Sequence, residues 1–424
     1  MLDIKFIRDN VDLVRENIAN RRVRVDVDRL LALNEERVTL VQTTEALRQE
    51  RNEIAGKMKG PMSPEERTPL VERGKALKEE LAALEATLAT VETEMTTTLK
   101  SVPNMTHPDV PVGGEDDARE LETVGTIPTF DFPVRDHLEL GRMHDMIDFE
   151  RAAEVTGSSF YYLKNDAALL ELALVAYAMN VIVAKGYAPH LTPDLARPDI
   201  LEAIGFNPRG EESQVYMIEG HDLCLIGTAE ITLGGMLAGQ ILRKEELPLR
   251  LGGFSHCFRT EAGAHGRESR GLYRVHQFSK VEMFAFTTPE MSEDVHAEML
   301  AIEKEIYGGL EIPFRVVDIA TGDLGAPAYR KYDIEAWMPS RETYGEVTST
   351  SNCTEYQSRR LNIRYRDEEN RAQFVHTLNG TAVAVPRAII AIIENHQNAD
   401  GTITVPGVLR PYLGGREFIG KAVS

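Results

Sequence analysis

Two arginines, an aromatic ring and two carboxylates lie at short, even spacings in the stretch FRTEAGAHGRESRGLYRVHQFSKVEMF. Successive side chains of a β-strand point to opposite faces, so even spacing collects such groups on one face. The first expected strand contributes Arg259 and Glu261 to this face, and the second contributes Arg274, His276, Phe278, Lys280 and Glu282. Burying this face without a ligand is costly, because charges need partners.

A polyanion that carries a flat base suits this set of side chains. Arginine can clamp a phosphate with two hydrogen bonds, and Phe278 offers a stacking surface for a purine. Carboxylates can accept hydrogen bonds from an exocyclic amine or pair with an ammonium group. The alternative is an exposed hairpin whose charges pair with one another. The spacing alone leaves both interpretations open.

The elements that would position these residues follow a mixed pattern. Short β-type runs alternate with amphipathic helical patterns, which predicts an α+β fold with an antiparallel sheet carrying helices. The expected strands are 187–191, 223–226, 253–261, 272–286, 314–319, 332–338 and 344–349. The expected helices are 167–185, 291–307, 351–365 and 387–396. The apolar run 167–184 is about as long as a membrane span, but Glu171 and Asn180 interrupt it, which favours a buried core helix.

The first hundred residues have a helical pattern with one strong break, GKMKGPMSPEE. A heptad seam follows the break, at Leu77, Leu81, Leu84, Leu88, Val91 and Met95. An earlier helix over about 29–58 would pair with it as an antiparallel coiled-coil hairpin roughly 45 Å long. The far part of this hairpin, 37–78, holds nine basic and six acidic residues in a chain of net charge −20. It could reach a polyanion, or it could be an ordinary solvated helical surface.

Composition divides the chain into three parts. We expect a helical hairpin over 1–105, a linker rich in Pro, Gly and acidic residues over 106–135, and the α+β core over 136–424. The N-terminus mixes charges of both signs and has no apolar signal region. Three widely separated cysteines indicate reduced thiols, so we expect a cytoplasmic protein without a structural zinc site.

Several long, ordered motifs resemble those of one family, and the resemblance covers essentially the whole chain. The stretch quoted above resembles motif 2 of class II aminoacyl-tRNA synthetases, in the form found in seryl-tRNA synthetases. GYAPHLTPDL resembles motif 1, and LNGTAVAVPRAIIAIIENHQNADGTITVPGVLRPYLGG resembles motif 3. TAE and EVTSTSNCTEYQSRR match further family segments. The resemblance implies the class II antiparallel sheet with flanking helices, plus an N-terminal antiparallel coiled-coil arm that is entirely helical and binds tRNA.

The resemblance implies an ATP site with three catalytic arginines. Arg259 would contact the α-phosphate and Arg274 the outer phosphates, and adenine would lie between Phe278 and Arg387. The other implied ATP contacts are Thr260, Glu261 (to the adenine amino group), Val275, Glu346, Val347, Thr348 and Ser349. The last of these, Ser349, would hold Mg²⁺ together with Glu346.

The implied amino-acid substrate is L-serine. Glu282 would meet its ammonium group and Thr381 its hydroxyl. The remaining implied serine contacts are Thr228, Ala229, Glu230 and Arg259. Serine carboxylate would attack the α-phosphorus and release pyrophosphate, and a terminal hydroxyl of tRNA would then attack the acyl carbon. This chemistry depends on positioning and charge stabilisation, and it requires no nucleophilic side chain.

The implied partners are tRNA-Ser with its long variable arm, tRNA-Sec, and a second copy of the chain paired through motif 1. The hairpin arm of one subunit would reach tRNA at the other subunit's active site. No membrane partner is expected. The implied tRNA contacts are Arg37, Arg48, Arg51, Lys57, Lys59, Arg73, Lys75 and Lys78 on the hairpin, and Arg267 and Arg270 in the motif 2 loop.

The chain departs from the family pattern at Gly227, at Pro386 and over 203–219. These departures flank the expected site and raise the hypothesis of a second, resistance-type copy of the enzyme. The alternatives are another class II synthetase, a serine-activating ligase that charges a carrier protein, and a non-catalytic coiled-coil adaptor. Only a few residues follow PYLGG, which leaves no room for the anticodon-binding domain usual in threonyl-, prolyl-, histidyl- and glycyl-type relatives.

Overall fold

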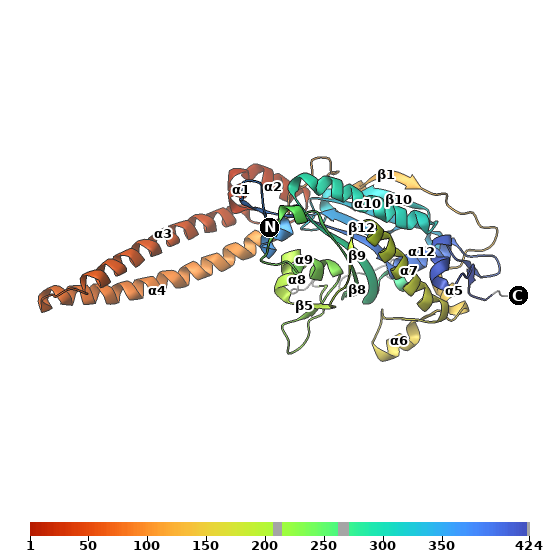
Figure 1. Ribbon diagram of the computed structural model, residues 1–424, viewed down its shortest axis with the longest axis horizontal. Coiled ribbons are helices and arrows are strands. Elements are labelled where there is room, and N and C mark those ends of the chain that lie inside the picture. Colours follow the sequence, from red (N-terminus) through yellow and green to blue (C-terminus); the bar gives the residue numbers. More distant parts are fainter. Residues whose placement is uncertain (207–213, 262–270, 422–424) are drawn as a thin grey trace. The chain divides into compact units, whose positions relative to one another are not determined.

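The computed structural model describes residues 1–206, 214–261 and 271–421, and it divides into two compact units (Figure 1). The first unit is Met1–Met105 and the second is Thr106–Ser424. Each unit has its own hydrophobic core.

The first unit is a long helical hairpin with two short helices packed at its base. Its elements are α1 (Ile4–Asp9), α2 (Val11–Asn20), α3 (Val27–Lys57) and α4 (Pro64–Ser101), and α3 and α4 run side by side (Figure 1). Ser63 begins α4, because its side chain accepts from the Glu66 amide while the Glu66 carboxylate accepts from the Ser63 amide. The predicted hairpin is confirmed.

The core of the first unit is concentrated at the base of the hairpin. Leu30 and Leu33 of α3 and Val91 and Met95 of α4 are buried there together with side chains of α1 and α2. Further along the heptad seam, Leu77 and Leu81 are also buried, whereas Leu84 is only partly buried.

The second unit is built on an eight-stranded sheet. Its strands, in spatial order, are β1 (Arg119–Val124), β10 (Phe314–Asp318), β11 (Arg330–Met338), β12 (Thr343–Asn352), β15 (His376–Ala384), β9 (Gln277–Thr287), β8 (Leu249–Phe258) and β4 (Ala188–Leu191). Neighbouring strands are antiparallel except β4, which pairs with β8 in parallel. The predicted α+β class is confirmed.

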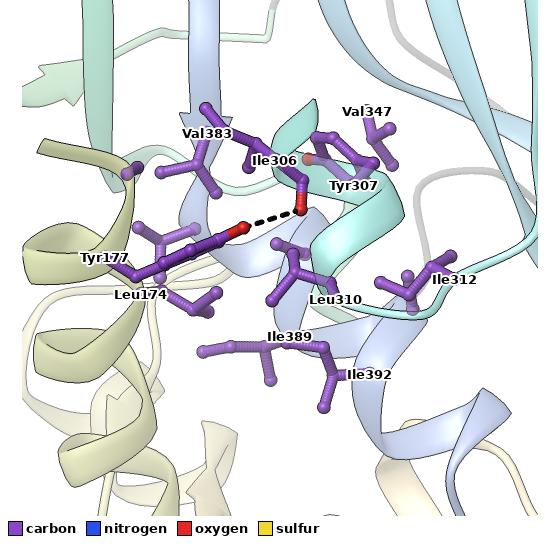
Figure 2. Close-up of a cluster of buried hydrophobic side chains, with 14 of the residues drawn as sticks. Leu174, Tyr177, Ile306, Tyr307, Leu310, Ile312, Val347, Val383, Ile389 and Ile392 are labelled. Atoms are coloured by element: carbon purple, nitrogen blue, oxygen red, sulfur yellow. Dashed lines mark hydrogen bonds between the residues drawn. The ribbon is translucent and has the colours of Figure 1, made fainter. Parts of the chain in front are cut away.

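Three helices cover one face of this sheet: α7 (Asn165–Ala184), α10 (Ser292–Gly309) and α12 (Val385–Asn395). Their apolar side chains form the main core with those of the sheet (Figure 2). In this core the Tyr177 hydroxyl of α7 donates a hydrogen bond to the Ile306 carbonyl oxygen of α10 at 3.3 Å, so this buried hydroxyl has a hydrogen-bond partner.

Strand β9 shows how the two faces of the sheet differ. Its odd-numbered residues Val281 and Met283 pack into the main core under the helices. The even-numbered Phe284 and Phe286 pack on the other face, in a second core with α8 (Pro198–Ile204) and α9 (Ala229–Gly235). The residues of the opening stretch therefore belong to the face that α7, α10 and α12 leave uncovered.

The second unit also contains smaller helices and strands, and these strands pair in small sheets of their own. These smaller elements are α5 (His137–Met143), α6 (Phe149–Val155), α11 (Tyr356–Leu361), β2 (Ile147–Asp148), β3 (Tyr162–Leu163), β5 (Leu195–Ala196), β6 (Cys224–Leu225), β7 (Ile241–Arg243), β13 (Arg364–Arg366), β14 (Ala372–Phe374), β16 (Ile403–Thr404) and β17 (Phe418–Ile419).

Three expectations from the sequence need correction. The segment 106–135 is not only a linker, because it contains β1, which pairs with β10 at the edge of the sheet. The helix expected over 351–365 is shorter, since β12 continues to Asn352 and β13 begins at Arg364. Strand β15 was not expected, although it lies in the middle of the sheet.

Helix α7 is buried on one side only. Among the described helices it alone is long and apolar enough to cross a membrane, a property that core helices share. Leu170, Leu174 and Tyr177 lie in the core, whereas Leu169 and Leu172 are exposed. The expected buried helix is thus found with an additional exposed apolar side.

Candidate active site

The sheet opens between β12 and β15, and a cavity lies at the opening. The two strands pair only at Thr350–Gly380, Ser351–Asn379 and Asn352–Leu378. Beyond these pairs, β12 remains paired with β11 and β15 remains paired with β9. The cavity has a volume of about 260 Å³ and is lined by residues of β9, β12, β15 and the segments that adjoin them.

A β-bulge in each diverging strand sets which side chains face the cavity. In β12 the pairing with β11 skips Val347, and in β15 the pairing with β9 skips Ala382. A bulge adds one residue to the alternation, so side chains three positions apart share a face. Glu346 and Ser349 therefore both line the cavity. The same device in β15 places Thr381 and Ala384 on the cavity side.

The floor of the cavity is the regular part of β9. Phe278, Lys280 and Glu282 alternate along this strand and all line the cavity, as the spacing predicts. Arg274 also lines it but precedes the strand. The expectation for His276 is wrong, because the strand begins only at Gln277. The imidazole of His276 lies beside Phe160 and hydrogen-bonds the Arg259 carbonyl oxygen through Nδ1 at 2.9 Å.

One end of the cavity carries arginines and an aromatic ring. The Arg259 guanidinium carbon lies 5.4 Å from the centre of the Phe278 ring, and its Nη2 donates to the Gly227 carbonyl oxygen at 3.3 Å. Nη1 of Arg274 is 3.2 Å from the Glu261 carboxylate. Three guanidinium groups, those of Arg259, Arg274 and Arg387, line this one cavity, which suits several phosphate groups.

Arg387 is held by its neighbours in the first turn of α12. Its Nη1 donates to the Glu346 carbonyl oxygen at 3.0 Å and lies 3.2 Å from the Glu346 carboxylate. Its guanidinium carbon is 4.6 Å from the centre of the Tyr273 ring. Pro386 stands in the same first turn, a position where proline is compatible with a helix.

The other end of the cavity carries buried carboxylates. Nζ of Lys280 is 2.5 Å from the Glu282 carboxylate, and the Thr381 hydroxyl donates to the same carboxylate at 3.3 Å. Burial and the nearby charge of Glu282 raise the pKa of Glu230 to about 7. This end can receive a small cationic group with a hydroxyl beside it.

Glu230 is fixed by several neighbours. Its carboxylate accepts from the side-chain amide of Gln357 at 2.7 Å and from that of Asn379 at 3.1 Å. The Thr228 hydroxyl caps α9 by accepting from the Glu230 backbone amide at 3.2 Å. These contacts point the carboxylate of Glu230 into the cavity, whose lining it forms.

The described residues contain no group of three or more His, Cys, Asp or Glu side chains placed to hold a metal by themselves. Mg²⁺ commonly keeps several waters and takes one or two protein oxygens together with substrate phosphates. Glu346 and Ser349 share a face of β12 and offer such oxygens, so this pair fits a magnesium ion held mainly by phosphates.

The structure brings most of the predicted site residues together. Those that line the cavity are Thr228, Glu230, Arg259, Glu261, Arg274, Val275, Phe278, Glu282, Glu346, Val347, Thr348, Ser349, Thr381 and Arg387. Ala229 is instead fully buried in the second core, and Thr260 lies outside the lining. Arg267 and Arg270 fall outside the described residues.

The sequence analysis missed Tyr273 and Asn379 as site residues, and it assigned no role to Lys280. All three line the cavity. Lys280 carried a signal, because it shares the even spacing of its neighbours on β9. Asn379 carried none, because β15 was not expected to be a strand.

The basic residues predicted on the hairpin fall into two sets. Arg37, Arg48 and Arg73 each pair with a glutamate of the opposite helix, at 2.8 to 3.0 Å. The others make no ion pair within the described part of the chain: Arg51, Lys57, Lys59, Lys75 and Lys78.

Two family models match the chain. Residues 1–106 match the seryl-tRNA synthetase N-terminal domain, and residues 214–396 match the tRNA synthetase class II core domain for G, H, P, S and T. Together they extend over both units.

Relatives and solved structures agree with these matches. A serine–tRNA ligase of Treponema denticola is 55% identical over 98% of this chain and 99% of its own length. One of Rhodopirellula baltica is also 55% identical, over 98% of each chain. The structure of seryl-tRNA synthetase from Pyrococcus horikoshii complexed with ATP superimposes with a TM-score of 0.90 at 39% identity, over the whole of both chains. This chain therefore belongs to the seryl-tRNA synthetase family.

Proposed function

We propose that this chain activates L-serine with ATP and transfers the serine to tRNA-Ser. The observation that carries the proposal is the division of one cavity into an arginine-rich end and an end with two buried carboxylates. Relatives of equal length are serine–tRNA ligases, and a solved relative is complexed with ATP.

In the first step ATP occupies the arginine-rich end. Adenine stacks between Phe278 and Arg387, and Glu261 accepts from its amino group. Arg259 holds the α-phosphate, and Arg274 holds the outer phosphates. As the serine carboxylate attacks the α-phosphorus and pyrophosphate leaves, these guanidinium groups stabilise the charge that develops on the phosphate oxygens.

Serine binds at the opposite end. Its ammonium group pairs with the carboxylates of Glu230 and Glu282, and its hydroxyl meets Thr381. Lys280 already pairs with Glu282 and so limits the negative charge that surrounds the ammonium group. A pocket that hydrogen-bonds the hydroxyl disfavours alanine, because the buried polar groups would be left unpaired.

Glu346 and Ser349 are the residues that would hold magnesium. When bound, Mg²⁺ would neutralise charge on the phosphate oxygens. The protein's own contribution is to present these two oxygen donors on one face of β12, beside Arg387.

The second step transfers serine to tRNA. The terminal hydroxyl of the tRNA attacks the acyl carbon of the adenylate, the acyl–phosphate bond breaks, and AMP leaves. Arg51, Lys57, Lys59, Lys75 and Lys78, which form no ion pair with any residue that the structure describes, are the best candidates for contacts with the tRNA backbone. We propose that the chain also transfers serine to tRNA-Sec.

The exposed side of α7 is the best candidate for a homodimer surface. Leu169, Leu172 and Val183 follow helical spacing along this side and are all exposed. A long exposed apolar stripe is a common mark of a protein interface. Motif 1, which includes β4, adjoins this helix.

Exchange of pyrophosphate into ATP in the presence of serine tests the proposed first step. Arg259→Ala should lower the exchange rate by about 10²-fold or more, because it removes a donor to the reacting phosphate. Arg197→Ala is the control, since Arg197 is an exposed partner of Asp199. Exchange that depends on another amino acid, or full exchange by Arg259→Ala, would contradict the proposal.

Two hypotheses from the sequence stay predictions. A ligase that charges a carrier protein would show serine-dependent exchange without charging tRNA. A resistance-type copy would keep its activity in the presence of a non-hydrolysable seryl-adenylate analogue that inhibits an ordinary relative. Gly227 and Pro386, which prompted the second hypothesis, lie beside Arg259 and Arg387 respectively.

A further inference from the structure

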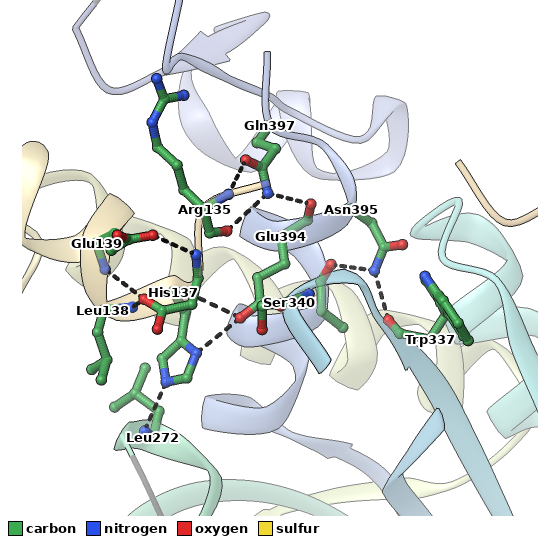
Figure 3. A network of polar contacts seen from close by, with 12 residues as sticks. Arg135, His137, Leu138, Glu139, Leu272, Trp337, Ser340, Glu394, Asn395 and Gln397 are labelled. Carbon is green, nitrogen blue, oxygen red and sulfur yellow. Dashed lines mark hydrogen bonds and ion pairs between the residues drawn. The ribbon is translucent and has the colours of Figure 1, made fainter. Parts of the chain in front are cut away.

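A buried polar network joins three segments that are far apart in the sequence (Figure 3). His137 is the first residue of α5, Glu394 lies in the last turn of α12, and Leu272 lies in the short helix η4 (Gly271–Tyr273). Nδ1 of His137 is 2.9 Å from Oε1 of Glu394, and the Leu272 amide donates to Nε2 of His137 at 3.3 Å. The side chains of His137 and Glu394 are only 6% and 1% exposed.

These contacts define the tautomer of the imidazole. Nε2 accepts from a backbone N–H, so it carries no proton, and the proton is on Nδ1, where it faces the Glu394 carboxylate. The imidazole of His137 thus donates a hydrogen bond to the buried carboxylate of Glu394 and accepts one from the buried amide of Leu272. Leu272 is completely buried, so its amide would be left without this acceptor if the imidazole were removed.

Gly271 makes this close approach possible. Its φ angle is +72°, and a Cβ atom at this position would lie 2.1 Å from Nε2 of His137. Only glycine both adopts this backbone conformation freely and leaves room for the ring. Gly271 therefore allows the imidazole of His137 to reach the backbone amide of Leu272.

The network leads directly to the cavity. Leu272 precedes Tyr273, whose ring centre is 4.6 Å from the Arg387 guanidinium carbon and 4.5 Å from that of Arg341. The Tyr273 hydroxyl donates to the Glu346 carbonyl oxygen at 3.2 Å. Displacing Leu272 would therefore move the surface against which Arg387 rests.

Glu394 acts on the same tyrosine from a second direction. Its Oε2 accepts from the Ser340 amide at 3.1 Å, and the next residue, Arg341, lies against Tyr273. Glu394 stands two turns after Arg387 on the same helix. Glu394 thus ties α5, through His137, and the segment of Ser340 to the helix that carries Arg387; Figure 3 shows its contacts with His137 and Ser340.

We propose that His137 and Glu394 are positioning residues that hold Tyr273 against Arg387 and so orient this arginine for the adenine ring. Neither side chain lines the cavity, so they act through η4 and α12. The inference rests on the proposed function, in which Arg387 contacts the adenine of ATP.

Two substitutions of His137 separate its two bonds. In His137→Gln the amide oxygen can take the place of Nε2 and accept from Leu272. In His137→Asn the shorter amide can still donate to Glu394 but cannot reach Leu272. Asn395→Ala is the matched control, because Asn395 is buried on the same helix and donates to the Trp337 carbonyl oxygen at 2.8 Å (Figure 3).

The measurement is serine-dependent ATP–pyrophosphate exchange by the full chain, with KM determined separately for ATP and for serine. His137→Asn should raise the KM for ATP about tenfold, because a buried amide loses its acceptor, and should leave the KM for serine within about twofold. His137→Gln should restore much of the affinity for ATP, and Asn395→Ala should leave both constants near those of the unaltered chain.

A purely structural role would give a different pattern. Equal effects of His137→Asn and His137→Gln, equal increases in the two KM values, or the same loss in Asn395→Ala would each overturn the inference. Thermal unfolding of each variant shows which of them are folded at the assay temperature. If His137→Asn is not folded, Glu394→Gln takes its place, with the same expected rise in the KM for ATP alone. Failure of the proposed function is distinguishable, because then the unaltered chain itself shows no exchange with serine.

Discussion

At the scale of single residues, the two ends of the cavity differ in composition. Arg259, Arg274 and Arg387 lie at one end, whereas Glu230 and Glu282 are buried at the other end beside Lys280. Because burial and Glu282 raise the pKa of Glu230 to about 7, this carboxyl is partly protonated at neutral pH. A bound ammonium group would favour its ionised form, so serine binding and the protonation of Glu230 are coupled.

The affinity for serine should therefore increase between pH 6 and pH 8. The sign follows from the raised pKa, since Glu230 is mostly neutral below pH 7 and mostly charged above it. The dissociation constant of serine should fall about tenfold over this range if the ionised form binds. Titration calorimetry at several pH values measures it. Glu230→Gln should remove the dependence, and a pH-independent constant in the unaltered chain would contradict the assignment.

Part of this site could be predicted from spacing and part could not. The regular alternation of Phe278, Lys280 and Glu282 is visible in the sequence, and the cavity floor follows it. Glu346 and Ser349 are three residues apart, and strict alternation would place them on opposite faces. The bulge in β12 brings both side chains to the same face, and the position of this bulge depends on the pairing of β12 with β11. The prediction that Glu346 and Ser349 belong to one site came from the family resemblance and not from their spacing.

At the scale of elements, the hairpin is stabilised unevenly. Leu33 is fully buried at its base, among side chains of four helices, whereas Leu84 further along is only partly buried between two. The cross-helix ion pairs, such as Arg48–Glu85, are exposed to solvent and so add little. Leu33 should therefore contribute more than Leu84 to the free energy of unfolding of this unit.

Alanine substitutions at the two leucines test this distribution. In a fragment of residues 1–105, Leu33→Ala should lower the free energy of unfolding by about 3 kcal/mol, because it leaves a cavity in the core. Leu84→Ala should cost less than half as much, since water already reaches this side chain. Denaturant unfolding followed by circular dichroism gives both values. Equal losses would show that the seam is uniform along the hairpin.

The elements that sequence analysis found and missed differ in how local their signals are. The hairpin was found because a heptad seam and a break of Gly and Pro residues are local features. Strand β15 was missed because it belongs to the interior of the sheet, and Asn379 and Gly380 weaken any strand pattern in its sequence. The strand β1 within 119–124 has five exposed residues, so its position rests on pairing with β10.

At the scale of the whole molecule, the homodimer proposed above would form through the exposed side of α7. Leu172→Glu should weaken this association at least tenfold, about 1.4 kcal/mol, because it places a charge in an apolar interface. Val112→Glu is the control, since Val112 is similarly exposed (65% against 67%) but belongs to a segment whose backbone bonds Thr321 and Gly322. Sedimentation equilibrium measures both. A dimer unaffected by Leu172→Glu would exclude this surface.

The division into two units also predicts that the two steps of the reaction depend on different parts of the chain. The residues that line the cavity belong to the second unit, whereas the basic residues of the hairpin belong to the first. Activation of serine should therefore survive the loss of the distal hairpin, and transfer to tRNA should not. The acidic net charge of −20 is compatible with tRNA binding if contact is confined to such local basic positions.

The most direct test is transfer of labelled serine to total tRNA by the full chain and by a variant in which a short Gly-Ser linker replaces residues 45–84. This replacement keeps the buried base of the hairpin. We expect the full chain to charge tRNA, and the variant to lose charging while it retains serine-dependent ATP–pyrophosphate exchange. Charging at full rate by the variant would contradict the role of the hairpin. Exchange by the full chain without any charging would contradict the proposed function itself.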